Sequence, residues 1–132
     1  MRIVIADDHE VVRRGVCSIL ESREDLRVCG EASNGADAVQ KANELRPDLV
    51  ILDVTMPVMD GFAAARQITK TLPQMPVLML SMHDGKEMIR ASKSAGAHGF
   101  VTKTEVGSTL LTAVDALLQG GMYFPDGSSN GK

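Results

Sequence analysis

The stretch LVILDVTMPVMDG, residues 49–61, sets a pattern that other parts of the chain repeat. Leu49–Leu52 is a continuous apolar run, which is typical of a strand buried on both faces of a parallel sheet. Asp53 ends the run, and open α/β sheets place their ligand sites beyond the carboxyl ends of the strands. Taken alone, Asp53 fits equally well as a turn or helix-capping residue. The other strands must therefore be compared before Asp53 is given a role.

Short apolar runs alternate with segments whose apolar residues recur every three to four positions, the spacing of amphipathic helices. The further strands predicted are residues 3–6, 26–32, 77–80 and 100–101. The helices predicted are residues 10–21, 38–45, 62–72, 86–95 and 106–119. Pro47 ends the second helix, because a residue before proline is disfavoured in the α conformation. Asp60 is expected to cap the third helix.

Five strands that alternate with five helices predict a doubly wound α/β domain with a parallel sheet and right-handed crossovers. The domain is expected to span residues 1–120. Residues 121–132 are rich in glycine and serine, so they are expected to be a linker or a truncated tail.

The composition fits one globular domain with an aliphatic core, since 132 residues are 44% hydrophobic and only 3% aromatic. A net charge of −3 argues against a nucleic-acid footprint. Cys17 and Cys29 match neither a metal-ligand spacing nor a disulfide framework, so they are expected to be reduced core residues. The N-terminus MRIVIADD has no signal-peptide pattern, and no apolar run approaches 18 residues, which favours a cytoplasmic protein without a membrane segment.

Polar side chains follow four of the predicted strands. They are Asp7 and Asp8, Asp53, Ser81 and Lys103. Because the carboxyl ends of parallel strands share one edge of the sheet, these side chains are expected to converge. Three clustered carboxylates repel one another unless a cation offsets them, and ligands that are all oxygen suit Mg²⁺. A metal, a lysine and a hydroxyl beside a carboxylate can support transfer of a phosphoryl group to that carboxylate.

Each of these residues also has an ordinary structural explanation when it is considered alone. Asp7 and Asp8 could favour the start of a helix through its dipole. Ser81 could be a simple strand-end hydroxyl, and Lys103 a solvated surface charge. Their joint placement at strand ends favours a shared site.

The segments IADDHE, LDVTMPVMDG, LSMHD and GAHGFVTK resemble the receiver domain of bacterial two-component response regulators over residues 1–120. The segments DDHEVVRRG, LSMHD and GGMYF resemble the NarL/FixJ subfamily, whose members carry a C-terminal LuxR-type helix-turn-helix. The resemblance implies a flavodoxin-like fold with strand order 2-1-3-4-5.

The resemblance also implies roles for individual residues. Asp53 would be both the phosphoacceptor and a metal ligand, Asp8 the principal metal ligand, and Asp7 would act through water. Thr55 would offer its backbone carbonyl to Mg²⁺, for which Mn²⁺ could substitute.

Two further residues would bind the phosphoryl group or respond to it. Ser81 would be the switch hydroxyl and Lys103 the lysine that pairs with the phosphate. Phe100 would occupy the aromatic switch position, where it lacks the hydroxyl of the frequent tyrosine.

The resemblance implies a signalling switch that promotes its own phosphotransfer and dephosphorylation and is not otherwise an enzyme. A sensor histidine kinase would be the phosphodonor and would dock on the first helix, with Val11, Arg14 and Ser18 outward. Phosphorylation would favour a homodimer through the fourth helix, fifth strand and last helix. DNA would be reached only through a C-terminal domain absent from this chain.

Three alternatives remain open. A haloacid-dehalogenase-like phosphatase would need a second acid at the position of Thr55. A flavodoxin-like nucleotide or flavin module would need a Gly-rich loop after the first strand, where Asp7–Glu10 would repel a phosphate. A receiver that binds partners without phosphorylation would not require the full set of carboxylates and lysine.

Overall fold

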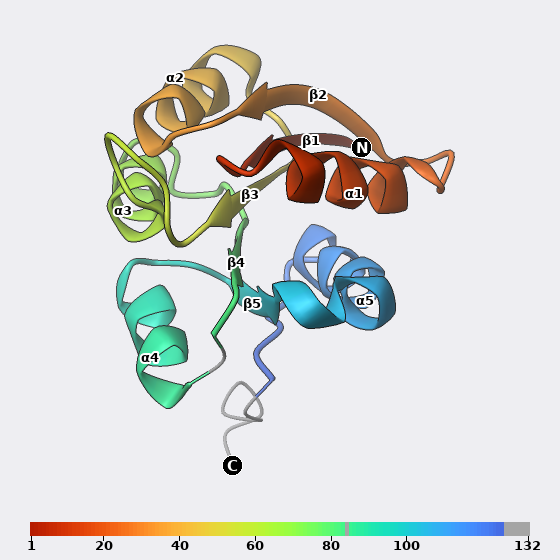
Figure 1. Ribbon diagram of the computed structural model, residues 1–132. Coiled ribbons are helices and arrows are strands. Elements are labelled where there is room, and N and C mark those ends of the chain that lie inside the picture. The colour runs from red at the N-terminus through yellow and green to blue at the C-terminus, as the bar shows by residue number, and fades with distance from the viewer. Residues whose placement is uncertain (84, 126–132) are drawn as a thin grey trace.

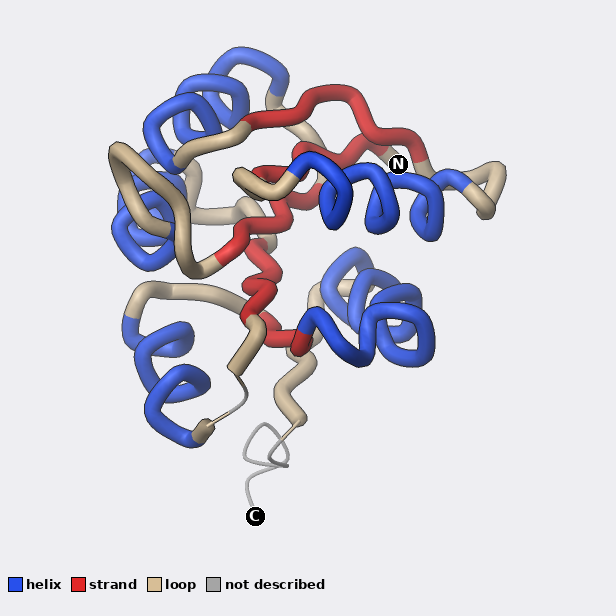
Figure 2. Tube along the Cα trace, viewed as in Figure 1, coloured by secondary structure: helices blue, strands red, loops and turns tan. Residues whose placement is uncertain are grey.

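The computed structural model describes residues 1–83 and 85–125, which form a five-stranded parallel sheet flanked by helices (Figures 1 and 2). The strands are β1 (Arg2–Ala6), β2 (Arg27–Ala32), β3 (Leu49–Asp53), β4 (Val77–Ser81) and β5 (Gly99–Thr102). The helices are α1 (Glu10–Glu21), α2 (Gly35–Leu45), α3 (Gly61–Thr71), α4 (Lys86–Ser94) and α5 (Val106–Leu118), with a 3-10 turn η1 (Lys103–Glu105) before α5. The strand order β2-β1-β3-β4-β5 confirms the predicted flavodoxin-like topology.

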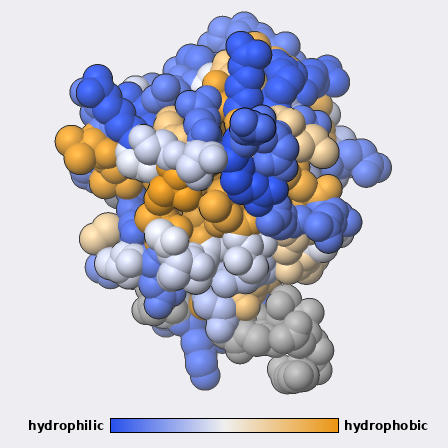
Figure 3. Space-filling model, turned by 90° about the vertical axis from the view of Figure 1, so that its right-hand side faces the viewer, coloured by the Kyte–Doolittle hydropathy of each residue, from blue (hydrophilic) through white to orange (hydrophobic). Residues whose placement is uncertain are grey.

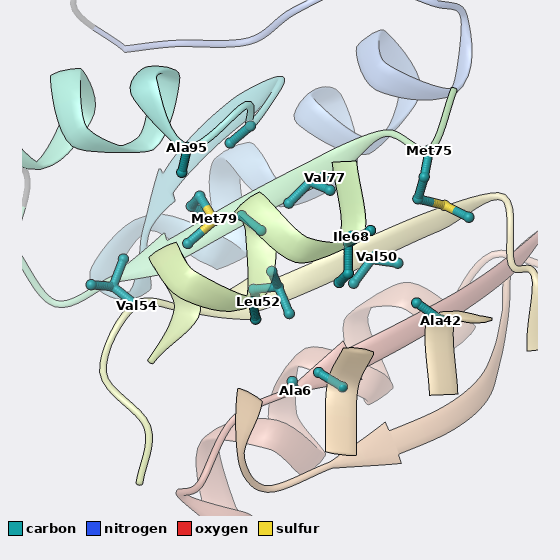
Figure 4. Close-up of a cluster of buried hydrophobic side chains, with 14 of the residues drawn as sticks. Ala6, Ala42, Val50, Leu52, Val54, Ile68, Met75, Val77, Met79 and Ala95 are labelled. Carbon is teal, nitrogen blue, oxygen red and sulfur yellow. The ribbon is translucent and has the colours of Figure 1, made fainter. Parts of the chain in front are cut away.

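The sheet separates two hydrophobic layers. Side chains at alternate strand positions pack with α2, α3 and α4 on one face, and the intervening positions pack with α1 and α5 on the other. Along β3, for example, Val50 and Leu52 face the first layer, while Leu49 and Ile51 face the second. Figure 4 shows the first layer, where Ile68 of α3 lies over Val50. Burial on both faces explains why the strands are apolar throughout.

Local signals in the sequence determine where several helices begin and end. Asn34 and Asp60 cap α2 and α3, since their side-chain oxygens accept the backbone N–H groups of Asp37 and Ala63 at 2.8 and 2.9 Å. Helix α2 stops at Leu45 as predicted, because Arg46 before proline adopts a left-handed conformation with φ of 47°. The capping role predicted for Asp60 is thus confirmed.

The chain after α5 packs against the domain, although the sequence indicated a linker. Residues 121–125, part of the expected linker, run beside β5, and Tyr123 forms a parallel bridge with Gly99. Phe124 is buried in the layer formed with α2, α3 and α4. Residues 126–132 lie outside the described part of the chain, and the boundary at residue 120 stays a prediction.

Two further expectations can be compared with the structure. Cys17 and Cys29 are free but only partly buried. Among the described residues, every helix is too short or too polar to cross a bilayer.

Candidate functional site

The carboxyl ends of β1 and β3 bring three carboxylates together. These strands are neighbours, with Ala6 opposite Leu52, so the residues that follow them, Asp7 and Asp53, lie side by side. Asp7, Asp8 and Asp53 each offer an oxygen within 4.8 Å of the others. Asp7 and Asp53 are buried, whereas Asp8 is exposed to solvent. The acidic cluster therefore has a buried floor and an open side.

Lys103 reaches this floor from the end of β5. Its Nζ lies 2.9 Å from Oδ2 of Asp7 and 3.0 Å from Oδ2 of Asp53, and its side chain is only 5% exposed. Among the described residues, these two Oδ2 atoms have no hydrogen bond of good geometry besides the ion pair. One ammonium thus faces two buried carboxylates, which leaves negative charge that a further cation can offset.

The pKa values of these groups reflect the same imbalance. Burial raises the pKa of Asp53 to about 6, and the neighbouring charge of Asp7 adds to the rise, while Lys103 and the Thr55 backbone oppose it. Burial alone would lower the pKa of Lys103, but its bonds to Asp7 and Asp53 outweigh burial and raise it. Lys103 is therefore held as a cation in the floor of the site.

Two other predicted site residues, Thr55 and Ser81, lie near the acidic cluster. The backbone N–H of Thr55 donates to Oδ1 of Asp53 at 3.4 Å. Ser81, at the buried end of β4, accepts the backbone N–H of His83 at 3.0 Å and lies opposite Thr102 of β5. The structure thus places Thr55 and Ser81 at the same edge of the sheet as Asp53.

Phe100 lies deeper in the fold than the other predicted site residues. It is opposite Met79 in the sheet, is fully buried, and packs in the layer with α4. Its side chain belongs to the core, so it can affect the acidic cluster only through packing.

Two residues near the cluster were not predicted. His9 is exposed in the loop between β1 and α1, and its Nδ1 lies 3.3 Å from Oδ1 of Asp8 and 3.5 Å from Oδ1 of Asp7. Arg13 donates from a guanidinium nitrogen to the backbone carbonyl of Asp7 at 2.7 Å. The adjacency Asp-Asp-His could have indicated His9, whereas Arg13 reaches from the first turn of α1 to Asp7, six residues earlier at the end of β1, which no motif signals.

The loop between β3 and α3 shapes one wall of the site. Gly61 packs so closely on Asp53 that a Cβ atom would collide with its backbone carbonyl. Its N–H donates to the carbonyl of Val54 at 2.8 Å, which folds the loop back on the strand end. Within this loop Val58 has φ of 69° and is 84% exposed, an unfavourable conformation for a β-branched residue. The loop is therefore held in one strained shape beside Asp53.

The donor set fits a hard divalent cation. Carboxylate oxygens are what Mg²⁺ and Mn²⁺ prefer, and the exposed side of the cluster leaves room for water ligands. The two buried Oδ2 atoms without a hydrogen bond would gain from the added charge.

The strand order β2-β1-β3-β4-β5, with helices packed on both faces of the sheet, defines the class of flavodoxin-like doubly wound α/β domains. The family of response regulator receiver domains matches residues 3–115, and the chain belongs to this family.

The chain is similar to curated regulators that are longer than itself. It is 39% identical over 125 residues to the transcriptional regulatory protein LnrK of Bacillus subtilis, covering 95% of this chain and 57% of LnrK. It is 41% identical over 125 residues to the response regulator protein VraR of Staphylococcus aureus strain NCTC 8325, covering 94% of this chain and 59% of VraR. The chain thus spans less than two thirds of these relatives.

Solved structures agree with this assignment. A LuxR-family response regulator from Aurantimonas sp. SI85-9A1 has a TM-score of 0.90 at 34% identity, covering 95% of this chain and 90% of that one. The receiver domain of the putative response regulator NarL from Mycobacterium tuberculosis has a TM-score of 0.84 at 34% identity. The match covers 90% of this chain and 96% of that one. The relatives are LuxR- and NarL-type regulators, as the sequence motifs predicted.

Proposed function

We propose that this domain is a phosphorylation-activated switch in which Asp53 accepts a phosphoryl group from a sensor histidine kinase in a reaction that depends on Mg²⁺. The observation that carries the proposal is the pairing of two buried carboxylates, Asp53 and Asp7, with one ammonium, that of Lys103. This arrangement leaves an ionised carboxylate at the open edge of the sheet together with an unbalanced negative charge.

The chain's own residues supply most of the chemistry. An oxygen of Asp53 attacks the phosphorus of phosphohistidine, the P–O bond forms as the P–N bond breaks, and the imidazole leaves. Asp8, Asp53 and the Thr55 carbonyl, with Asp7 through water, would hold a Mg²⁺ ion, which would neutralise charge on the phosphoryl oxygens. Lys103 is already beside Asp53 and pairs with another phosphoryl oxygen. The same residues would also support hydrolysis of the acyl phosphate by water. The domain would therefore influence how long its own phosphorylated state lasts.

The response to phosphorylation would pass through Ser81 and Phe100. In the unmodified domain the Ser81 hydroxyl accepts the His83 N–H, so it must rotate to donate to a phosphoryl oxygen. Phe100 would then move into the vacated space, shift the surface of α4, β5 and α5, and favour a homodimer. The output would be transcription through a C-terminal DNA-binding domain, as the names of the relatives suggest, in a cytoplasmic protein.

The face formed by α1 and α5 is proposed to bind the kinase. Figure 3 shows apolar side chains gathered on this face and bordered by hydrophilic ones. Val11 is 84% exposed, and the neighbouring Val12 and Ile19 are only partly covered. Arg14 and Ser18 are exposed on the same helix. An exposed apolar strip with charges beside it suits a reversible helix-to-helix contact.

The proposal is tested by intact mass after incubation with a small-molecule phosphodonor. We expect addition of one phosphoryl group that requires Mg²⁺ and is lost in Asp53→Asn. A second arm measures Mg²⁺ binding, which Asp8→Ala should weaken at least tenfold while the exposed-acid control Glu24→Gln leaves it unchanged. A folded protein that is never phosphorylated would instead favour a receiver that binds its partners without phosphorylation.

A further inference from the structure

The segment after α5 forms an unforeseen extension of the sheet. The Gly121 N–H donates to the Ala116 carbonyl at 2.8 Å and turns the chain back at the end of α5. The Tyr123 N–H then donates to the His98 carbonyl at 3.0 Å, and the Phe100 N–H donates to the Tyr123 carbonyl at 2.9 Å. Figure 1 shows this segment leaving α5 and passing β5. Residues 121–125, which we name the exit segment, therefore close the otherwise open edge of β5.

A side-chain anchor accompanies these backbone bonds. Phe124 is only 6% exposed and belongs to the same buried cluster as Phe100 and Ile89 of α4. Lys93 of α4 places its Nζ 4.7 Å from the centre of the Phe124 ring. Gly99 allows the close approach, since a Cβ there would lie 3.0 Å from the Tyr123 carbonyl oxygen. The exit segment is thus held on β5 in an extended form, with Phe124 packed in the same buried cluster as Ile89 of α4.

The exit segment also contacts the residue through which the proposed switch acts. Phe100 binds Tyr123 through its backbone and shares a packing cluster with Phe124. Phe100 lies on the strand that ends directly before Lys103, the cation held by Asp53. Strand β5 and the exit segment are therefore linked by both hydrogen bonding and packing.

We propose that docking of the exit segment on β5 is coupled to the state of Asp53, so that phosphorylation loosens the segment. This inference rests on the proposed function. A Phe100 side chain that moves toward the phosphorylated site withdraws packing from Phe124 and displaces the N–H that holds Tyr123. Because coupling between two equilibria is reciprocal, loss of docking must favour the phosphorylated conformation by the same factor.

Hydrogen exchange of single amides tests the docking without any phosphodonor. We expect Phe124→Ala to accelerate exchange of the Phe100 and Tyr123 amides at least tenfold, with partial restoration in Phe124→Leu. Met122→Ala is the matched control, because Met122 belongs to the same segment and is 58% exposed. Unchanged exchange at both amides in Phe124→Ala would overturn the docking role.

The coupling is tested by repeating the exchange on protein whose phosphorylation is verified by mass. Exchange of the Phe100 and Tyr123 amides should rise at least fivefold, while the Arg46 amide, bonded to the Ala42 carbonyl at the end of α2, should not change. In the reverse direction, Phe124→Ala should bind the phosphoryl analogue beryllofluoride at least fivefold more tightly than Met122→Ala. Full phosphorylation with unchanged exchange would refute the coupling alone, whereas absence of phosphorylation would refute the proposed function and the coupling that rests on it.

Discussion

Replacing Asp53 by asparagine should stabilise the metal-free domain, although it removes the proposed phosphoacceptor. In the wild type, Asp7 and Asp53 are both buried against the single cation Lys103. The substitution removes one of these carboxylates and leaves Lys103 paired with Asp7. The buried charges are then balanced one to one, so the cost of burying an unneeded negative charge is removed.

The size of the effect follows from the pKa of Asp53. Burial raises that pKa from 3.8 to about 6 in the folded protein. At pH 7.5 such a rise corresponds to roughly 3 kcal/mol of lost stability, since one pKa unit is about 1.4 kcal/mol. Removing the charge would restore this stability, but burying the neutral amide of asparagine has a cost of its own. We therefore expect the variant to be more stable than the wild type by about 2 kcal/mol. For a domain of this size that corresponds to a rise in Tm of roughly 8 °C.

The pH dependence gives the prediction a second signature. Between pH 6 and pH 4 the folded wild type binds the Asp53 proton while the unfolded chain does not. Wild-type stability therefore rises as the pH falls through 6, relative to the variant. The advantage of Asp53→Asn should be complete above pH 7 and should disappear by about pH 4.

Urea unfolding in EDTA, followed by circular dichroism at several pH values, measures both effects. Glu24→Gln removes an exposed acid and serves as the control. Excess Mg²⁺ should reduce the difference in unfolding free energy between the variant and the wild type, because the ion binds the wild type more tightly. An Asp53→Asn protein that is equally or less stable than the wild type at pH 7.5 in EDTA would refute the argument that Asp53 is buried with uncompensated charge.

Three further predictions concern residues outside the acidic cluster. Val58→Gly should raise stability by about 1 kcal/mol in urea unfolding, because glycine relieves the positive φ of an exposed residue; a loss of stability would show that the valine is not strained. Burial lowers the pKa of His98, whose Nδ1 accepts the Val77 N–H at 3.2 Å. The contribution of His98 to folding stability is therefore present above pH 6.5 and is lost as the pH falls below 6.5. Measured in the Asp53→Asn background, His98→Asn should flatten the stability profile between pH 7 and 5, and an unaltered slope would contradict this. Burial raises the pKa of Cys17 to about 11, so iodoacetamide should modify it about a hundredfold more slowly at pH 8 than a thiol of pKa 9.0; equal rates would mean an accessible thiolate.

Parts of the site could be predicted because they depend on strand ends. Asp7, Asp53 and Lys103 each follow an apolar run, and the rule that parallel strands share a carboxyl edge brings them together. The distances that join Lys103 to the two acids depend on how far β1, β3 and β5 are offset, which the residue pattern does not contain. The assigned roles of these residues as phosphoacceptor, metal ligands and switch stay predictions.

Other features were not predictable because their causes are nonlocal. The exit segment was interpreted as a linker, since Gly120 and Gly121 end the helix and the residues beyond Pro125 are mostly small and polar. Phe124 is buried only because residues 121–125 pair with the edge of β5 and its side chain joins the cluster that contains Phe100 and Ile89 of α4. Likewise, no motif indicates that the residue before β5, His98, accepts the Val77 N–H at the start of β4 through its Nδ1.

The sequence by itself determined the element order, the parallel sheet and the edge at which the polar residues meet, because apolar periodicity, caps and prolines act within a few residues of one another. Only the tertiary structure decided that Lys103 is shared by Asp7 and Asp53, that Phe100 lies in the core, and that the exit segment continues the sheet. These contacts join residues far apart in the chain, and their energies depend on the burial and spacing that the whole fold creates.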